Sequence, residues 1–219
     1  MAFVAHTEAD ADKPFAESMR LHSKYQGKIQ LTGKFPIQGV DDWAFYYTPG
    51  VGAPCRAIEA DPDEVFELTN RGNTVAVVTD GSRVLGLGNI GPKAGLPVME
   101  GKALLYKYFG GVDAFPICLG TQNQDEIIQA VRWLEPSFGG INLEDIASPK
   151  CFAILDRLRE NMDIPVWHDD QQGTATVLLA ALINALKIVN KRKEDTTMAV
   201  IGSGAANIAI VDLLIADGF

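Results

Sequence analysis

The stretch "GGINLEDIASPKCFAILDRLRENMDIPVWHDDQQGTA", residues 139–175, decides the fold that the sequence predicts. It holds two apolar runs, "GGINLE" and "IPVWH", separated by a segment with helical spacing. Within that segment Ser148 is typical of a helix N-cap, and Pro149 is typical of a first helical position. A strand, a helix and a strand in this order predict two parallel strands joined by a crossover helix.

The same alternation continues outward from this stretch in both directions. Strands are predicted at residues 74–80, 83–88, 114–120, 139–144, 164–168 and, before a glycine turn, from 197. Helices are predicted at residues 14–26 (opened by Pro14), 54–70 (interrupted near Pro62), 99–111, 123–135, 148–160, 174–189 and from 208. We therefore predict an α/β fold, a parallel sheet with helices on both faces, followed by the start of a Rossmann-type dinucleotide-binding domain.

A charged stretch, "KRKEDT" at 191–196, marks a predicted domain boundary. Residues 1–195 are expected to form one domain, and 196–219 the incomplete beginning of a second. A complete dinucleotide-binding domain needs several more strands and an acidic residue about 20 residues past its glycines. We expect this chain to end inside its second domain and, made alone, to be inactive.

Composition excludes several classes of function. The formal net charge of -9 over 219 residues disfavours binding to nucleic acid, because phosphates would be repelled. The three cysteines are scattered without metal-ligand spacing, which is typical of free thiols in a reducing compartment. Neither a targeting segment nor an apolar run long enough for a bilayer is found. The expectation is a cytoplasmic protein without a membrane segment.

Acidic residues stand at the ends of the predicted strands. Glu144 and Asp145 follow one apolar run, and Asp169 and Asp170 follow the next. In an open α/β sheet the site lies outside the carboxyl ends of the strands. Clustered carboxylates favour a hard divalent ion, Mg²⁺ or Mn²⁺. Helix N-capping is the alternative, but it explains one acid at each position and not two.

Two further residues have chemistry that suits a catalytic role. Lys102 follows a glycine near the start of the helix predicted at 99–111, where the helix dipole would lower its pKa and suit it to act as a general base. A lysine on the surface is the plain alternative. In "FYYTPGVG", a tyrosine held before the Thr-Pro-Gly turn can donate a proton, although aromatic packing explains it equally well.

The stretch "VIGSGAAN", residues 200–207, resembles a dinucleotide-binding turn, because it follows a predicted strand and opens a helix. The pattern places Asn207 where a third glycine or another small residue is usual. The cofactor-binding residues expected from it are Gly202, Ser203, Gly204, Ala205, Ala206 and Asn207.

Together these segments resemble the malic enzymes, most closely the short form of bacteria and archaea. The resemblance rests on "YYTPGVG", "VAVVTDGSRVLGLGNIGPKAGLPVMEGKALLYKYFGGVDAFPICLGTQ", "FGGINLEDIASPKCF", "VWHDDQQGTATVLLAAL" and "VIGSGAANIAI", in this order. It implies oxidative decarboxylation of malate to pyruvate and CO₂ with NAD or NADP and Mg²⁺ or Mn²⁺. It also implies a homodimer as the expected assembly.

The resemblance further implies a role for individual residues. Tyr47 would be the general acid and Lys102 the general base, held in place by Asp169. Glu144, Asp145 and Asp170 would be the metal ligands. Arg83 matches an arginine that grips a substrate carboxylate in some members, although many short-form relatives lack it.

Two other readings stay open at this point. One is a related dehydrogenase, such as a malolactic enzyme or an amino-acid dehydrogenase; the latter needs no metal, so the four acids argue against it. The other is a non-catalytic assembly module, since the chain holds little of the cofactor site.

Overall fold

The computed structural model describes residues 8–219, and its centre is a four-stranded parallel sheet of order β2–β1–β3–β4. The strands are β1 (Thr74–Thr79), β2 (Asp113–Cys118), β3 (Gly140–Leu143) and β4 (Val166–His168). In the register, Val77 of β1 lies opposite Pro116 on one side and Asn142 on the other. Proline lacks an amide donor, and Pro116 is tolerated because β2 is an edge strand.

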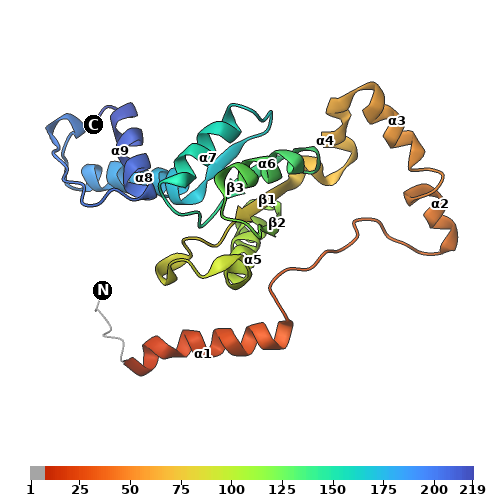
Figure 1. Cartoon of the computed structure of the whole chain (residues 1–219), viewed down its shortest axis with the longest axis horizontal. Coiled ribbons are helices and arrows are strands. Elements are labelled where there is room, and N and C mark those ends of the chain that lie inside the picture. The colour runs from red at the N-terminus through yellow and green to blue at the C-terminus, as the bar shows by residue number, and fades with distance from the viewer. Residues whose placement is uncertain (1–7) are drawn as a thin grey trace.

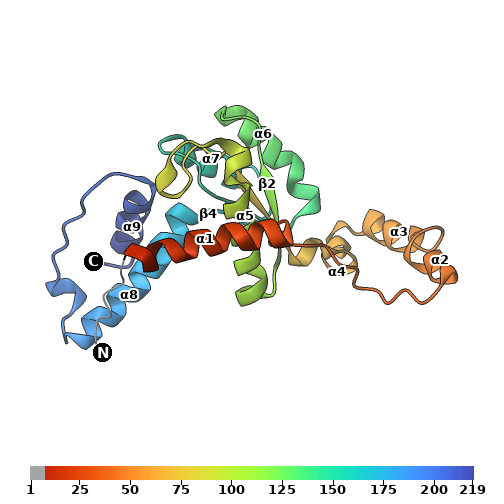
Figure 2. The ribbon, with the colours of Figure 1, turned by 90° about the horizontal axis from the view of Figure 1, so that it is seen from below.

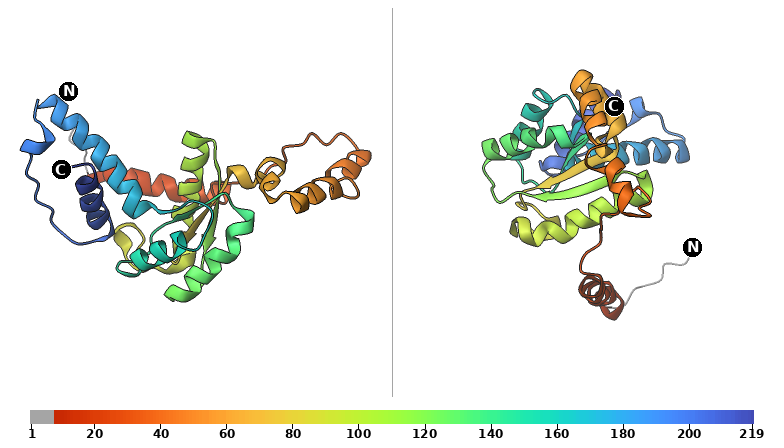
Figure 3. Two further views of the ribbon diagram at one scale, coloured as in Figure 1. Left: turned by 90° about the horizontal axis from the view of Figure 1, so that it is seen from above. Right: turned by 90° about the vertical axis from the view of Figure 1, so that its right-hand side faces the viewer.

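Helices cover both faces of this sheet, as predicted. Helix α5 (Gly91–Gly110) packs on one face, and α6 (Gln124–Leu134) and α7 (Lys150–Arg159) pack on the other (Figure 3, right). The main apolar core lies between the sheet and the pair α6 and α7, where Ile127, Ile141 and Ile154 are fully buried. The Asn123 side chain caps α6 by accepting hydrogen bonds from two backbone amides.

The C-terminal helices form a second, smaller apolar cluster. Helix α8 (Thr174–Ile188) packs against α9 (Ala205–Ala216) through Ala175, Ile210 and Leu214. Helix α9 also packs against the turn between β4 and α8. The end of the chain therefore lies close to the carboxyl end of β4.

The part of the chain before β1 stands away from the sheet (Figures 1 and 2). It contains α1 (Glu8–Tyr25), α2 (Trp43–Tyr46), α3 (Gly52–Ala60) and α4 (Val65–Leu68). None of residues 13–75, the part of this region whose burial is described, is buried. The break predicted near Pro62 is confirmed, because a short 3₁₀ turn at Pro62–Glu64 separates α3 from α4.

Two of the six predicted strands are wrong. Residues 83–88 form a 3₁₀ turn with one bridge, Val84 to Gly88, because Leu85 and Gly88 both take positive φ angles. Residues 197–201 are irregular, since no strand among the described residues lies beside them to accept their hydrogen bonds. Ile201 there is 93% exposed.

Three predicted helix starts are also wrong. Pro14 lies inside α1, and Ser148 makes no cap, since Pro149 is the residue before α7. Helix α5 begins at Gly91, earlier than the predicted residue 99, and continues through Pro97. The third correction matters for the site, because it places Lys102 in the middle of the helix.

Two further features concern the apolar length of the helices and the state of the cysteines. No helix among the described residues is both long and apolar enough to cross a membrane. Cys55, Cys118 and Cys151 are free thiols, the first exposed and the last buried.

Candidate metal and catalytic centre

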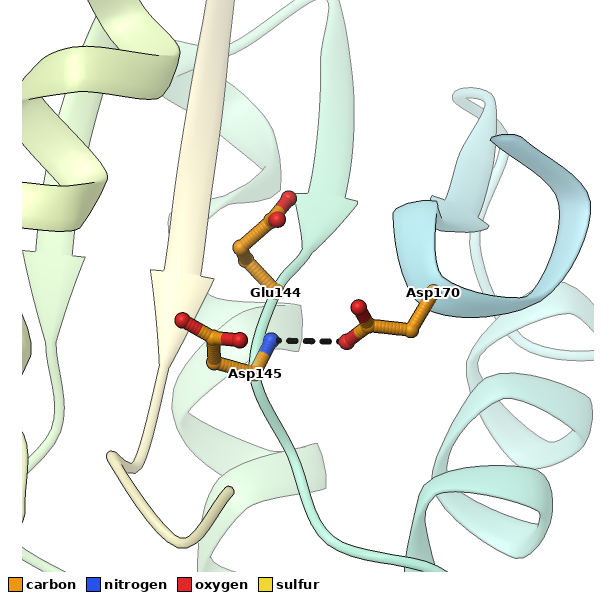
Figure 4. Close-up of side chains that lie close together, drawn as sticks. All are labelled: Glu144, Asp145 and Asp170. Atoms are coloured by element: carbon orange, nitrogen blue, oxygen red, sulfur yellow. Dashed lines mark hydrogen bonds between the residues drawn. The ribbon is translucent and has the colours of Figure 1, made fainter. Parts of the chain in front are cut away.

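The acidic residues predicted at the strand ends do meet at one edge of the sheet. Glu144 and Asp145 directly follow β3, and Asp170 lies on the turn that follows β4 (Figure 4). Each offers a carboxylate oxygen, and these three oxygens lie within 4.8 Å of one another. We call these three residues the carboxylate triad.

The backbone of β3 and its loop fixes the triad. The Asp145 amide donates to Asp170 Oδ2 at 3.1 Å, and Asp145 itself has a φ of 53°. Burial raises the pKa of Glu144 to about 7, even though Lys102 opposes the shift. Burial, with the nearby charge of Asp170, raises the pKa of Asp145 to about 6. The fold thus holds buried acidic groups close together, which costs free energy when they are charged. A bound cation would offset this cost.

Lys102 joins the fourth acid to this cluster. Its Nζ lies 2.6 Å from Asp169 Oδ2 and 3.1 Å from Glu144 Oε1. The predicted dipole effect is wrong, because Lys102 lies in the middle of α5 and not in its first turn. Burial alone would lower the pKa of Lys102, but Glu144 and Asp169 together raise it. The four acids therefore belong to one site, in which Lys102 links Asp169 to Glu144 of the triad.

The turn after β4 explains why two adjacent aspartates take different partners. Asp169–Gly173 forms a single wide helical turn that continues into α8. Asp169 faces Lys102, whereas Asp170 faces the backbone of Asp145. Gly173 makes this possible, because a Cβ atom there would lie 2.3 Å from Asp169 Oδ1.

A polar network behind Glu144 was not predicted from the sequence. Asn142, inside β3, donates to Glu144 Oε2 at 2.8 Å. The hydroxyl of Tyr106 donates to Asn142 Oδ1 at 3.0 Å and accepts from the indole of Trp167 at 3.1 Å. Tyr106 lies four residues after Lys102, one helical turn along α5. This spacing places both residues on one face of the helix and could have indicated that Tyr106 belongs near the site.

A second unpredicted cluster supports Asp145 from the end of β1. Asp80 is fully buried and pairs with Lys150 Nζ at 2.5 Å. Its other oxygen accepts from the hydroxyl of Ser82, which in turn accepts from the Ala147 amide at 2.9 Å. This turn and the loop after β3 are thereby held against each other. Asp80 stands directly after β1 but is not part of the triad.

His168 is fully buried beside the triad. Its Nδ1 lies 3.7 Å from Asp170 Oδ2, and neither ring nitrogen has a hydrogen-bond partner among the described residues. Burial lowers the pKa of His168. His168 is not among the residues whose ligand atoms lie close enough together to hold an ion.

Sequence comparison assigns the chain to a family. A family model described as "Malic enzyme, N-terminal domain" matches residues 26–126 and 120–159, and one described as "Malic enzyme, NAD binding domain" matches residues 171–218. The chain belongs to the malic enzyme family. The predicted resemblance and the α/β fold class are thus confirmed.

Individual malic enzymes give the same result. The chain is 58% identical over 192 residues to the "NAD-dependent malic enzyme" of Geobacillus stearothermophilus, covering 88% of this chain and 40% of that one. It is 53% identical over 198 residues to the "Bifunctional malic/malolactic enzyme" of Bacillus subtilis, covering 90% and 48%. It therefore spans less than half the length of these relatives.

A solved malic enzyme structure matches the whole chain. The crystal structure of the Entamoeba histolytica malic enzyme superposes with a TM-score of 0.91 at 44% identity, covering 100% of this chain and 47% of that one. The match includes the segment before β1. The extended course of that segment is thus shared with a solved member of the family.

Arg83 and Tyr47, which also have expected roles in the site, are not part of the triad. Arg83 is exposed next to it; its backbone amide donates to the Asp145 carbonyl at 3.0 Å, and its charge lowers the Asp145 pKa against the larger effect of burial. Tyr47 is the residue that directly follows α2. Its side chain is 67% exposed and makes no hydrogen bond among those described. The structure therefore does not bring Tyr47 to Lys102 within one chain.

The expected dinucleotide turn lies at the start of α9. Gly202 has a φ of 103°, which glycine tolerates, and Gly204 precedes the helix. Asn207, where a small residue is usual, turns its amide back to the Ile201 carbonyl at 2.8 Å. Since α9 packs against the turn that carries Asp169 and Asp170, the glycine turn and the triad belong to neighbouring elements.

Proposed function

We propose that the protein to which this chain belongs oxidatively decarboxylates malate to pyruvate and CO₂, with NAD or NADP and with Mg²⁺ or Mn²⁺. One observation carries the proposal. Lys102 contacts Glu144, which is itself part of the carboxylate triad. A small hydroxy acid held at the triad would therefore lie beside a base. Membership of the malic enzyme family indicates that this hydroxy acid is malate. We also propose the cytoplasm as the compartment of the reaction.

The residues of the triad fit a hard divalent ion. All three ligands offer carboxylate oxygen, the donor that Mg²⁺ and Mn²⁺ prefer. Asp145 Oδ2 is buried and has no hydrogen-bond partner among the described residues, so it is available as a ligand. When bound, the ion supplies Lewis-acid stabilisation of negative charge on substrate oxygen.

In this proposal Lys102 is the general base. It would accept the proton of the 2-hydroxyl group. An oxidised nicotinamide, when bound, would supply the acceptor for the hydride of C2. Lys102 must first give up its own proton, and its neighbours Asp169 and Glu144 favour the charged form. Positive charge held by the triad would offset Glu144 and lower the pKa of Lys102.

Tyr47 is the proposed general acid. After the loss of CO₂, its hydroxyl gives a proton to C3 of enolpyruvate, which completes pyruvate. The protons balance when the hydroxyl proton taken by Lys102 returns to Tyr47, which has given one proton to the C3 carbon of enolpyruvate.

Product analysis tests the proposal. The full-length protein with malate, Mn²⁺ and NAD⁺ or NADP⁺ should yield pyruvate and reduced nicotinamide in equal amounts. Lactate without net reduced nicotinamide would instead indicate the malolactic reaction, which the name of the Bacillus subtilis relative includes. Absence of malate turnover under all these conditions would contradict the proposal.

A matched pair of lysine variants tests the base. Lys102→Ala should lower kcat by about 10²–10⁴-fold, the usual contribution of general acid-base catalysis. Lys107 lies on the same helix but pairs with Asp113, away from the triad, so Lys107→Ala should retain activity. Equal activity of the two variants would remove Lys102 from the mechanism.

A further inference from the structure

A series of side-chain hydrogen bonds runs from β4 through α5 to Glu144. The indole Nε1 of Trp167 donates to the Tyr106 hydroxyl at 3.1 Å, and that hydroxyl donates to Asn142 Oδ1 at 3.0 Å. Asn142 Nδ2 then donates to Glu144 Oε2 at 2.8 Å. We call Trp167, Tyr106 and Asn142 the donor series; it ends on a residue of the carboxylate triad.

The register of the sheet brings the donor series together. Asn142 of β3 and Trp167 of β4 are paired in the register, so their side chains lie on the same face of the sheet. Glu144 follows Asn142 by two residues and lies on the same side. Tyr106 reaches both from α5, the helix that packs on this face. A Cβ atom at Gly140 would lie 3.1 Å from the Trp167 ring, so the glycine leaves room for the indole.

The chemistry of the groups fixes the direction of each hydrogen bond in the series. An indole can only donate, so the Tyr106 hydroxyl accepts from Trp167 and has its single proton left for Asn142. Burial raises the pKa of Tyr106 to about 12, so that proton stays on the hydroxyl. The Asn142 amide must then turn its oxygen to Tyr106 and its NH₂ group to Glu144. The reverse orientation would place the amide oxygen against a carboxylate oxygen.

Glu144 is thereby held between two different partners. Its Oε2 accepts from Asn142, and its Oε1 lies 3.1 Å from Lys102 Nζ. Asn142 is fully buried and Glu144 is 5% exposed, so water does not readily replace this contact. Without the Asn142 donor, the carboxylate could turn both oxygens toward Lys102. A divalent ion would then have to compete with the lysine for Glu144.

We propose that Asn142, oriented by Trp167 and Tyr106, is a positioning residue that keeps Glu144 turned for the divalent ion. This inference rests on the proposed function, in which Glu144 is a ligand of that ion. Hydrogen-bond partners of this kind orient the ligands of a metal site and increase its affinity. The donor series acts through Glu144 alone.

A purely structural role of the series would be to fasten α5 to the sheet. The rings of Tyr106 and Trp167 already pack edge to face, with their centres 6.3 Å apart, and this contact needs no hydroxyl. What the hydroxyl adds is the direction of the Asn142 amide. Removal of the hydroxyl alone therefore separates orientation from packing.

Mn²⁺ binding to the full-length protein tests the inference. Tyr106→Phe keeps the ring but leaves Asn142 Oδ1 without a donor, so Mn²⁺ affinity should fall by about tenfold, the lower end of the usual loss for such partners. Electron paramagnetic resonance of free Mn²⁺ measures the affinity. Wild-type affinity in Tyr106→Phe would overturn the inference, even if the melting temperature of the variant falls.

Tyr108→Phe is the matched control. Tyr108 lies on the same helix, is 80% exposed and makes no side-chain hydrogen bond among those described. Its Mn²⁺ affinity should equal that of the wild type. Equal losses in Tyr106→Phe and Tyr108→Phe would overturn the inference, because the contact with Asn142 would then not be the cause.

A double-mutant cycle tests whether Tyr106 acts through Asn142. Asn142→Leu removes the amide at similar size and should lower Mn²⁺ affinity by about 10–100-fold. Adding Tyr106→Phe should lower the affinity no further, because no amide is left to orient. Additive losses would overturn the inference. Should Asn142→Leu not fold, Asn142→Ala takes its place in the cycle.

Binding and turnover together separate this inference from the proposed function. A wild type that binds Mn²⁺ but does not turn over malate would contradict the proposed function, and the Tyr106→Phe titration would still decide the role of the donor series. An active wild type whose Tyr106→Phe variant binds Mn²⁺ normally would overturn the inference alone. A wild type that binds no Mn²⁺ would overturn both.

Discussion

Gly173 shows how one missing side chain shapes the site. Asp169 can lie beside Lys102 only because no Cβ atom occupies the space next to its carboxylate. No local turn requirement explains this glycine, since it has ordinary helical angles. Gly173 is needed because the Asp169 side chain, four positions earlier in the chain, comes close to it.

Gly173→Ala should therefore impair catalysis more than metal binding. The added methyl group pushes the Asp169 carboxylate away from Lys102, and misplacing a catalytic group can cost about 10²-fold in rate. Mn²⁺ affinity should change little, because the triad is not touched. Steady-state kinetics and Mn²⁺ titration measure the two effects.

Gly101→Ala is the matched control for this variant. A Cβ atom at Gly101 would meet nothing within 4 Å, and the residue lies inside α5. Activity should persist, and stability should rise by roughly 0.5–1 kcal/mol. Comparable loss of activity in both variants would show that the contact with Asp169 is not the cause.

The raised pKa values of Glu144 and Asp145 predict a pH dependence for metal binding. Ligation needs both carboxylates deprotonated, and their pKa values are about 7 and about 6. Mn²⁺ affinity should rise from about pH 5 to about pH 8, by up to about tenfold per unit while one proton is released. Electron paramagnetic resonance of free Mn²⁺ measures this; an affinity independent of pH over that range would contradict it.

The metal-free protein should show the opposite trend in stability. Both pKa values lie above the ordinary values of 4.5 and 3.8, so the protonated groups favour the folded state. This contribution is fully present below those ordinary values and is lost as the pH rises through about 6 and 7. Melting temperatures in chelator should fall over this range, and added Mn²⁺ should reverse the fall.

At the scale of elements, a buried ion pair joins the end of β1 to the start of α7. Asp80 is fully buried, and Lys150, the first residue of α7, pairs with it at 2.5 Å. Lys150→Met would leave the Asp80 charge without a partner. We expect a loss of about 3–5 kcal/mol in the free energy of unfolding, measured by urea denaturation.

A double-mutant cycle isolates this pair. Adding Asp80→Asn to Lys150→Met should recover part of the loss, since no buried charge then remains. Arg192→Met is the surface control, because its pair with Asp195 is exposed and such pairs contribute about 0–1 kcal/mol. Equal losses in Lys150→Met and Arg192→Met would refute the argument.

For the whole molecule, the exposed aromatic side chains of residues 29–68, which we call the arm, predict self-association. Phe45 is 72% exposed on α2, and a charge in its place should weaken a dimer held by the arm. Phe45→Glu should shift the full-length protein from dimer toward monomer in sedimentation experiments. Trp133→Glu, at a side chain 74% exposed on α6, should not. A dimer unaffected by Phe45→Glu would mean that the arm is not the interface.

The sequence by itself determined the four central strands and the acids that follow them. The run "VAVV" at 75–78 is continuously apolar because both faces of a parallel sheet are buried, so the pattern predicts this strand directly. The acids at the strand ends could be assigned to one edge, because parallel strands all end at the same side. The clustering of the four acids follows from these local patterns together with the topology rule, whereas the choice of Glu144, Asp145 and Asp170 as metal ligands came from the resemblance to the malic enzymes.

The tertiary structure decided what depends on neighbours distant in sequence. Residues 83–88 alternate like a strand, yet positive φ angles turn them back on themselves. Residues 197–201 have strand-like composition, but a strand needs a partner for its backbone hydrogen bonds, and none lies beside them among the described residues. The Asp80–Lys150 pair and the Tyr106–Asn142 contact join distant elements through single side chains, which no periodicity records.

The position of Tyr47 depended most on the tertiary structure. The motif "YYTPGVG" identifies the tyrosine, but motifs carry no information about direction in space. Contacts of Arg71 and Asn70, just before β1, orient the preceding segment away from Lys102 of the same chain. The sequence therefore predicted the residues of a malic enzyme site, whereas long-range packing decided which of them one chain brings together.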